Sequence, residues 1–313
     1  MSIAFPVLNR RTFILGAAAL ATGCLRTEPG GHIRIAAGDP GGLYLAFSRL
    51  LAERIHQRYP GIDVDVVPTA GSVENLHLLR AGTVDLGLAL ADVTERERAD
   101  GPTQTAPAAV ARVYENYLQV IVPDASPYHR VPDLRGARIS IGADGSGASE
   151  TSRILLAAAD LDGRVDLVAY RLREALAQLA ENSIAALVWS GGVPTPAIAE
   201  LDGVRPLRIL DISGQAWRMS DLSGYPYALR PVPTCAYVPS GIRSIGVANL
   251  LLCRQGIATE LVSATVQTLV NDAPRLVPPY IRGLQYLDAP SMIQTGAIPL
   301  HSGAVSAYRE LHG

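Results

Sequence analysis

The sequence predicts an α/β fold of two lobes, because strand-like segments, glycine-rich turns and helix-like segments alternate along it. The alternation runs over residues 33–92 and starts again over residues 137–212. Two β-prone runs, near residues 118–122 and 234–238, flank the second series. We expect each series to form a separate sheet, and the two flanking runs to cross between the lobes as hinge strands.

The expected hinge strands also divide the chain. Residues 1–24 form an export signal, residues 25–119 and 239–313 form lobe 1, and residues 120–238 form lobe 2. Residues 94–109 are polar and then rich in proline and alanine, so we expect a surface excursion there. Residues 247–272 are compatible with helix throughout, and we expect the C-terminal helices to return to lobe 1.

The stretch 69–76, Thr-Ala-Gly-Ser-Val-Glu-Asn-Leu, is expected to follow a strand over residues 62–67 and to open a helix. Ser72 is placed to be the N-cap of this helix, Gly71 permits the sharp turn, and Glu74 suits the positive end of the helix dipole. Such a junction directs hydroxyls and backbone N–H groups into a cleft, which favours an anionic ligand. An ordinary strand-to-helix turn with a capping serine would have the same sequence.

Composition excludes several classes of function. The chain has 313 residues, a net charge of −2 and 27 basic residues, all of them arginine. Without a basic stripe, nucleic acid is not an expected partner. Without lysine, P-loop and Schiff-base chemistry are excluded, because both need that side chain.

The N-terminal residues resemble an export signal. Arg10 and Arg11 form a twin-arginine pattern, and an apolar run over residues 13–21 is too short to span a bilayer. The run ends in Ala-Thr-Gly-Cys at residues 21–24, which resembles a lipoprotein cleavage box. We expect lipidation of Cys24 and an extracytoplasmic protein anchored to the cell membrane; an uncleaved anchor or plain secretion are the alternatives.

The sequence motifs do not favour an enzyme or a metal site. Ser72, Ser146 and Ser190 all lack the Gly-x-Ser-x-Gly pattern of a nucleophile elbow, and the six histidines form no metal-binding motif. Cys235 and Cys253 have no metal-ligand spacing, and a disulfide between them is left open. We therefore expect no catalytic residues, no metal and no cofactor.

Five segments together resemble the TAXI-type solute receptors of TRAP transporters. They are Gly-Asp-Pro-Gly-Gly-Leu-Tyr at 38–44, the stretch 69–76, Gly-Ala-Asp-Gly-Ser-Gly at 142–147, Ser-Gly-Gly-Val-Pro at 190–194, and Pro-Leu-His-Ser-Gly-Ala at 299–304 followed by Tyr-Arg-Glu at 308–310. The resemblance implies a periplasmic-binding-protein-like fold whose lobes close on a small solute and deliver it to TRAP membrane subunits. A lipoprotein that reports its ligand to a membrane sensor kinase would use the same closure and is the alternative.

The resemblance also implies a ligand and a set of ligand-binding residues. The expected ligand is a small carboxylate, either an amino acid such as glutamate or a related organic acid. The expected site comprises Gly41, Gly42, Tyr44, Thr69, Gly71, Ser72, Asn75, Ser146, Gly147, Ser149, Trp189 and Gly191. The chain departs from the family pattern at Leu45, where a second tyrosine is usual, and at Ala148, where threonine is usual.

We expect the ligand carboxylate to meet three hydroxyls, from Thr69, Ser72 and Ser146, and the N–H groups at one helix start in each lobe. Tyr44 and Trp189 would supply flat walls with a polar edge. Because both lobes contribute, the ligand would shift the chain from an open to a closed form.

Asp39 and Asp144 place carboxylates in two of the glycine-rich loops. If both merely cap turns and face water, they do not affect the ligand. If they face the cleft, they would repel a dianion and favour a ligand with an ammonium group beside its carboxylate.

The lipobox interpretation predicts that a Cys24→Ala variant is released from membranes into the soluble fraction, because no acyl chain can be attached. Fractionation of cells expressing the variant and the wild type measures this. Membrane attachment that survives the substitution would contradict the interpretation.

Overall fold

The computed structural model describes residues 29–100, 103–283 and 285–312. The twin-arginine pattern and Cys24 lie outside these residues. Within the described ranges, no helix combines the length and the apolar character needed to cross a membrane.

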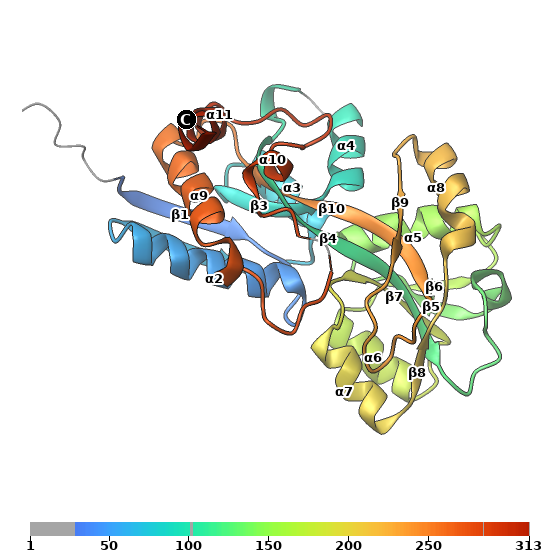
Figure 1. The fold of residues 1–313 in the computed structure, drawn as a ribbon. Coiled ribbons are helices and arrows are strands. Elements are labelled where there is room, and N and C mark those ends of the chain that lie inside the picture. Colours follow the sequence, from blue (N-terminus) through green and yellow to red (C-terminus); the bar gives the residue numbers. More distant parts are fainter. Residues whose placement is uncertain (1–28, 101–102, 284, 313) are drawn as a thin grey trace, which may run out of the picture.

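A single ten-stranded sheet runs through the molecule, in the order β2-β1-β3-β10-β4-β7-β5-β6, with β8 beside β4 and β9 beside β10 (Figure 1). The strands are β1 (Gly31–Ala36), β2 (Ile62–Val67), β3 (Leu86–Leu90), β4 (Ala108–Pro123), β5 (Arg138–Ser140), β6 (Asp166–Val168), β7 (Ala186–Gly191), β8 (Leu207–Ile209), β9 (Ala228–Pro231) and β10 (Arg243–Cys253). The expectation of two separate sheets is therefore wrong. Strands β4 and β10 are long enough to hydrogen-bond with neighbours in both halves, so the ladder is continuous.

Ten α-helices cover the sheet in the described part of the chain. They are α2 (Leu43–Arg58), α3 (Ser72–Arg80), α4 (Ala91–Asp100), α5 (Gly147–Ala158), α6 (Leu172–Ala180), α7 (Pro196–Val204), α8 (Ala216–Ser223), α9 (Thr259–Asn271), α10 (Ala289–Met292) and α11 (Ser302–His312). Two of these differ from expectation. Residues expected in a surface excursion form α4 directly after β3, and the helix expected over residues 247–272 begins only at Thr259.

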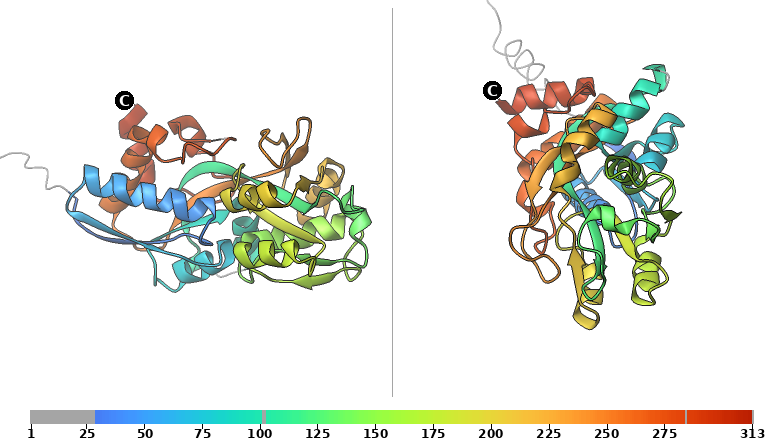
Figure 2. Two further views of the ribbon diagram at one scale, coloured as in Figure 1. Left: turned by 90° about the horizontal axis from the view of Figure 1, so that it is seen from below. Right: turned by 90° about the vertical axis from the view of Figure 1, so that its right-hand side faces the viewer.

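The two halves share the same construction. In lobe 1, β1 pairs in parallel with β2 and β3, and in lobe 2, β5 pairs in parallel with β6 and β7. Figure 2 shows the two halves side by side along the sheet, with α9 and α11 packed on the half that contains β1. One apolar cluster includes buried residues of both halves, among them Leu76 and Leu155.

The strands β4 and β10 connect the two halves as an antiparallel pair (Figure 1). β4 contains the expected hinge run at residues 118–122, whereas the second strand lies at residues 243–253 and not at 234–238. The run 234–238 forms a tight turn with a bridge between Cys235 and Val238. The misassignment has a physical cause: nearly all of β10 is buried on both faces, so its apolar run lacks the alternation that marks a strand.

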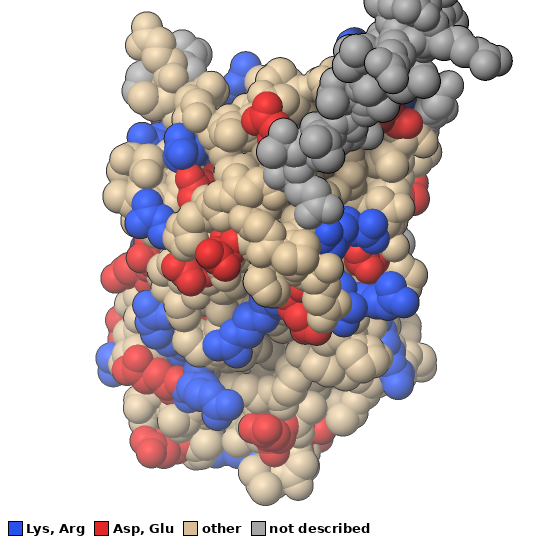
Figure 3. Space-filling view, turned by 90° about the vertical axis from the view of Figure 1, so that its left-hand side faces the viewer, with Lys and Arg blue, Asp and Glu red and all other residues tan. Residues whose placement is uncertain are grey.

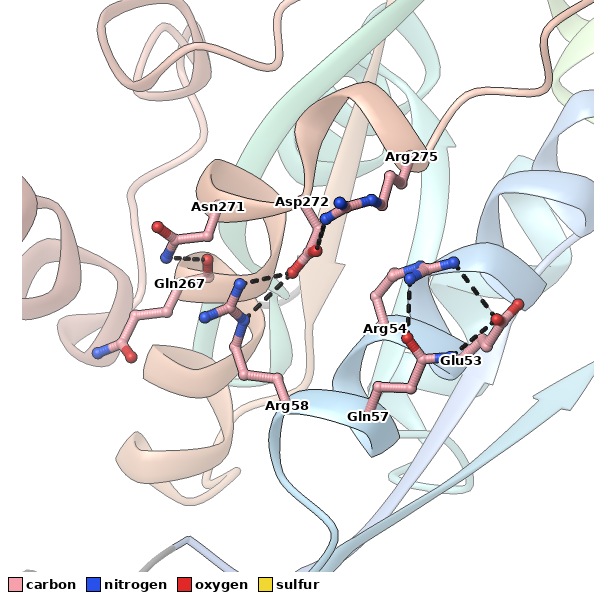
Figure 4. A network of polar contacts seen from close by, with 8 residues as sticks. All are labelled: Glu53, Arg54, Gln57, Arg58, Gln267, Asn271, Asp272 and Arg275. Carbon is pink, nitrogen blue, oxygen red and sulfur yellow. Dashed lines mark hydrogen bonds and ion pairs between the residues drawn. The ribbon is translucent and has the colours of Figure 1, made fainter.

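A polar network fixes the C-terminal helices to lobe 1 (Figure 4). Arg58, at the end of α2, donates through Nη2 to Asp272 Oδ2 at 2.8 Å, and Arg275 Nη1 lies 3.1 Å from Asp272 Oδ1. Although partial burial opposes it, these two guanidinium groups lower the pKa of Asp272. The Arg58–Asp272 ion pair therefore links the C-terminal end of α2 to the C-terminal end of α9.

The surface charge is mixed. Arginine and acidic side chains are interspersed on the face shown in Figure 3. This distribution agrees with the net charge of −2.

Candidate functional site

Helix α3 begins at the junction that the sequence singles out, but Ser72 is not its N-cap. Gly71 occupies the cap position with φ 135°, and Ser72 is the first helical residue. Glu74 Oε2 instead accepts the N–H of Ala70 at 2.6 Å, so the helix start has a side-chain acceptor without the serine. The hydroxyl of Ser72 is directed to strand β3, where its Oγ accepts the N–H of Leu90 at 3.0 Å.

A carbonyl group from lobe 2 occupies the positive end of α3. The N–H groups of Val73 and Glu74 both donate to the backbone oxygen of Gly145 at 3.1 Å. These are donors that a helix start leaves without intrahelical partners. In this conformation the Gly145 carbonyl thus occupies two of the N–H groups that we expect to meet a ligand carboxylate.

Helix α5 starts directly opposite. Ser146 is its N-cap, and Ser146 Oγ accepts the N–H of Ser149 at 3.1 Å. A Cβ added to Gly71 would lie 3.4 Å from Ser146 Cα, and one added to Gly147 would lie 2.5 Å from Ser72 Oγ. Close approach of the two helix starts therefore requires glycine at position 147, whereas at position 71 the positive φ of 135° favours it.

A cavity of about 40 Å³ lies between the lobes at this contact. It is lined by Gly38, Asp39, Gly42, Leu43, Tyr44, Ala70, Gly71, Ser72, Leu90, Asn116, Ser146, Gly147, Ala148, Trp189 and Ser190. The lining comes from both lobes and from the hinge strand β4, at the edge where open α/β sheets bind ligands. Its volume admits a few water-sized groups, so a larger solute needs the lobes to separate first.

Seven of the predicted site residues line this cavity: Gly42, Tyr44, Gly71, Ser72, Ser146, Gly147 and Trp189. The polar edges of its two aromatic walls are already engaged. Tyr44 donates its hydroxyl to Asn249 Oδ1 at 2.6 Å, and Trp189 donates Nε1 to Thr195 Oγ1 at 3.2 Å. The aromatic residues therefore offer mainly apolar surface to the cavity.

The other five predicted residues, Gly41, Thr69, Asn75, Ser149 and Gly191, do not line it. Thr69 donates its hydroxyl to Asn75 Oδ1 at 2.6 Å, and Asn75 Nδ2 donates to the carbonyls of Ala37 and Leu88 at 2.6 and 2.7 Å. These groups join β1, β3 and α3 within lobe 1. The hydroxyl of Thr69, expected to meet a carboxylate, is satisfied inside the protein instead.

Three polar residues of the lining, Asp39, Asn116 and Ser190, were not among the predicted ligand-binding set. Asp39 is 8 % exposed and Asn116 is 3 % exposed. Asp39 lies in a glycine-rich loop, and the sequence left open whether its carboxylate faces the cleft. Asn116 comes shortly before the β-prone run and belongs to no motif. Only the register of β4 places it at the cavity. Asp144, by contrast, is exposed and is not part of the lining.

Further polar contacts cross between the lobes. Arg171, at the start of α6, donates through Nη1 to the carbonyl of Thr69 at 3.4 Å and lies 3.7 Å from Asp39 Oδ2. On the other side of the α3–α5 contact, Arg96 Nη2 lies 3.2 Å from Glu150 Oε2. The closed arrangement is thus held by polar contacts on both sides of the cavity.

Asp92 is the most deeply buried charge at this boundary. Its Oδ2 accepts from Thr151 Oγ1 at 2.8 Å and from the hydroxyl of Tyr227 at 2.7 Å. Burial raises the pKa of Asp92, and the hydrogen bonds and nearby Arg96 offset part of that effect. The carboxylate therefore links the first turn of α4 to two elements of lobe 2.

The described residues contain no group of three or more acidic, histidine or cysteine side chains that could hold a metal ion. Cys235 and Cys253 are both free thiols.

The fold defined by these elements is the two-lobed α/β fold of periplasmic binding proteins. The periplasmic binding protein BugD is similar over 90 % of this chain and 97 % of its own, with 13 % identity and a TM-score of 0.61. The protein Tv2483, solved with L-arginine bound, is similar over 78 % of this chain and 87 % of its own, with 14 % identity and a TM-score of 0.51. The model of the NMT1-like family matches residues 35–311, and the chain belongs to that family.

The raised pKa of Asp92 predicts a defined pH dependence. The folded protein holds this proton more tightly than the unfolded chain, so protonation stabilises the fold. This stabilisation is complete below the ordinary aspartate value of 3.8 and is lost as the pH rises through the folded-state value. Relative to an Asp92→Asn variant, the wild type should therefore gain stability as the pH falls from 7 toward 4.

Urea unfolding of both proteins across that pH range measures the difference. An Asp144→Asn variant removes one negative charge from an exposed loop and serves as the control. A wild-type advantage over Asp92→Asn that shrinks on acidification would contradict the sign.

Proposed function

We propose that this chain is an extracytoplasmic solute receptor whose lobes close on a small carboxylate-bearing solute. The observation that supports this best is the cavity between the lobes, lined from lobe 1, lobe 2 and hinge strand β4. A solute held there touches both lobes only when they are closed. Its binding free energy therefore favours the closed form over the open form.

The start of α5 is the best place for the solute's carboxylate. Gly147 and Ala148, in the first turn of the helix, line the cavity together with the cap residue Ser146. First-turn N–H groups and the helix dipole favour an anion. The hydroxyl of Ser146 accepts from within the helix and keeps its own proton for a ligand oxygen.

In the open form, we propose that α3 offers a second set of donors. The N–H groups of Val73 and Glu74 lose their acceptor when the Gly145 carbonyl moves away with lobe 2. The carbonyl thus returns to these donors at each closure, as a fixed contact between the lobes. The solute then interacts with the α5 start and not with both helix starts.

The expected partners follow from the TAXI resemblance. The receptor is proposed to carry a lipid on Cys24, to bind an amino acid such as glutamate or a related organic acid, and to deliver it to TRAP membrane subunits. The division into lobe 1 (25–119 and 239–313) and lobe 2 (120–238) is retained as part of this proposal. The proposed function includes no catalytic activity.

A Gly147→Ala variant tests the closure directly. The added Cβ would lie 2.5 Å from Ser72 Oγ and 2.7 Å from Leu90 Cδ1, so the closed contact cannot form without a shift. Alanine is acceptable in a helix first turn, so each lobe should keep its fold. We expect a larger radius of gyration in X-ray scattering and solute binding weakened by about ten- to a hundredfold, the cost of overpacking a tight contact.

The matched control is Gly203→Ala in α7, where an added Cβ meets no atom within 4 Å. This variant should scatter like the wild type. If Gly147→Ala scatters like the wild type as well and binds solute equally, the proposed closure at this contact is wrong.

A further inference from the structure

Two hydrogen-bond acceptors in the cavity between the lobes have no partner among the described residues. They are Asp39 Oδ2 and Asn116 Oδ1, both fully enclosed atoms on residues that line this one cavity. Leaving a buried acceptor unsatisfied costs about 1–3 kcal/mol, and more for a charged group. Because both residues line the same cavity, their unsatisfied oxygens indicate the chemistry of what is bound there.

The environment of Asp39 leaves its charge only partly balanced. Burial raises the pKa of this carboxyl, and the Arg171 guanidinium, the backbone N–H of Leu172 and the Arg173 guanidinium counter the effect in part. Arg171 Nη1 lies 3.7 Å from Oδ2, beyond hydrogen-bond distance, and its side chain is half-exposed. Arg171 thus screens Asp39 from the solvent side without satisfying the oxygen.

Asn116 reaches the cavity from hinge strand β4. Its Nδ2 lies 3.4 Å from the carbonyl of Ser190, which fixes the amide with the nitrogen toward β7. The carbonyl oxygen Oδ1 is then the free end. The neighbouring residue Glu115, on the opposite face of the strand, is paired with Arg230 at 3.0 Å.

The cavity supplies no positive side chain to balance a second carboxylate. None of its lining residues is arginine or histidine, and the chain contains no lysine. The N–H groups of α3 are occupied by the Gly145 carbonyl. One anionic group can bind at the start of α5, but another would lie against the Asp39 carboxylate.

We infer that the solute carries a positively charged N–H group, an ammonium or a guanidinium, that donates to Asp39 Oδ2 and Asn116 Oδ1. A charged donor satisfies both acceptors and neutralises the buried carboxylate. Trp189, in the same lining, adds an apolar wall on which a cation is favourably placed. This assignment rests on the proposed receptor function, and it narrows the solute class by excluding dicarboxylates without an amine.

Matched pairs of compounds test the effect of the solute's amino group on binding. L-Alanine and pyruvate, and L-glutamate and 2-oxoglutarate, differ within each pair by an amino group in place of an oxo group. Agmatine and putrescine add amines without a carboxylate. Calorimetric titration of the full-length chain with each compound should give binding for at least one amine-bearing compound and none for succinate, pyruvate or 2-oxoglutarate.

An Asp39→Asn variant then tests the residue. The substitution keeps the shape and removes the charge, so affinity for the amine-bearing compound should fall by about ten- to a hundredfold. Asp144→Asn, the exposed aspartate of the facing loop, is the matched control and should bind like the wild type. The comparison within wild-type protein needs no variant, so a folding defect in Asp39→Asn would leave the test intact.

The cationic group and the receptor function are tested by different measurements. Binding of a 2-oxo acid or dicarboxylate in preference to its amine-bearing partner, or unchanged or tighter binding in Asp39→Asn, overturns the cationic group and leaves the receptor standing. Absence of binding by every amine in the panel also overturns it. The receptor function itself is decided separately by the scattering of Gly147→Ala.

Discussion

The contact between the N-termini of α3 and α5 is the constraint on which the rest of the site depends. Two positive helix ends face each other there, which would be unfavourable without an acceptor between them. The Gly145 carbonyl supplies that acceptor to α3, and the absence of a side chain at Gly147 allows the start of α5 to approach Ser72. The start of α5 is left without a carbonyl from the facing loop, and we propose that a solute anion binds there.

The hinge strands β4 and β10 give this contact its geometry. They are paired along their length and buried, so they form a stiff support on which the two halves can move. One face of β4 places Asn116 in the cavity, and the other places Glu115 in an ion pair with Arg230 on β9. The same strand therefore lines the cavity on one face and is tied to β9 by an ion pair on the other.

Much of the lobe architecture could be predicted from local patterns. β1, β2 and α2 follow from alternation, helical spacing and glycine turns, because those signals reflect burial on one face. β10 could not be predicted, since a strand buried on both faces has the same apolar run as a buried helix. The continuous sheet depends on pairings between residues more than a hundred positions apart, which no local pattern records.

In the candidate site too, some features could be predicted from local patterns and others could not. Glycine turns and serines at helix starts were visible in the sequence, and seven of the predicted residues line the cavity. The roles of Ser72 and Thr69 were not, because their hydroxyls are used by Leu90 and Asn75, and these partners are set by packing. Asn116 carries no motif at all, and its position follows from the register of β4 alone.

We expect a bound solute to draw the two lobes together at the α3–α5 contact. Pulsed electron spin resonance between labels at the exposed positions Arg49 on α2 and Glu174 on α6, each replaced by cysteine in a Cys235→Ser background, measures the separation of the lobes. We expect a longer distance in solute-free protein that shifts to a single shorter one when the amine-bearing carboxylate that binds most tightly is added. One distance, unchanged by a solute that calorimetry shows to be bound, would contradict it.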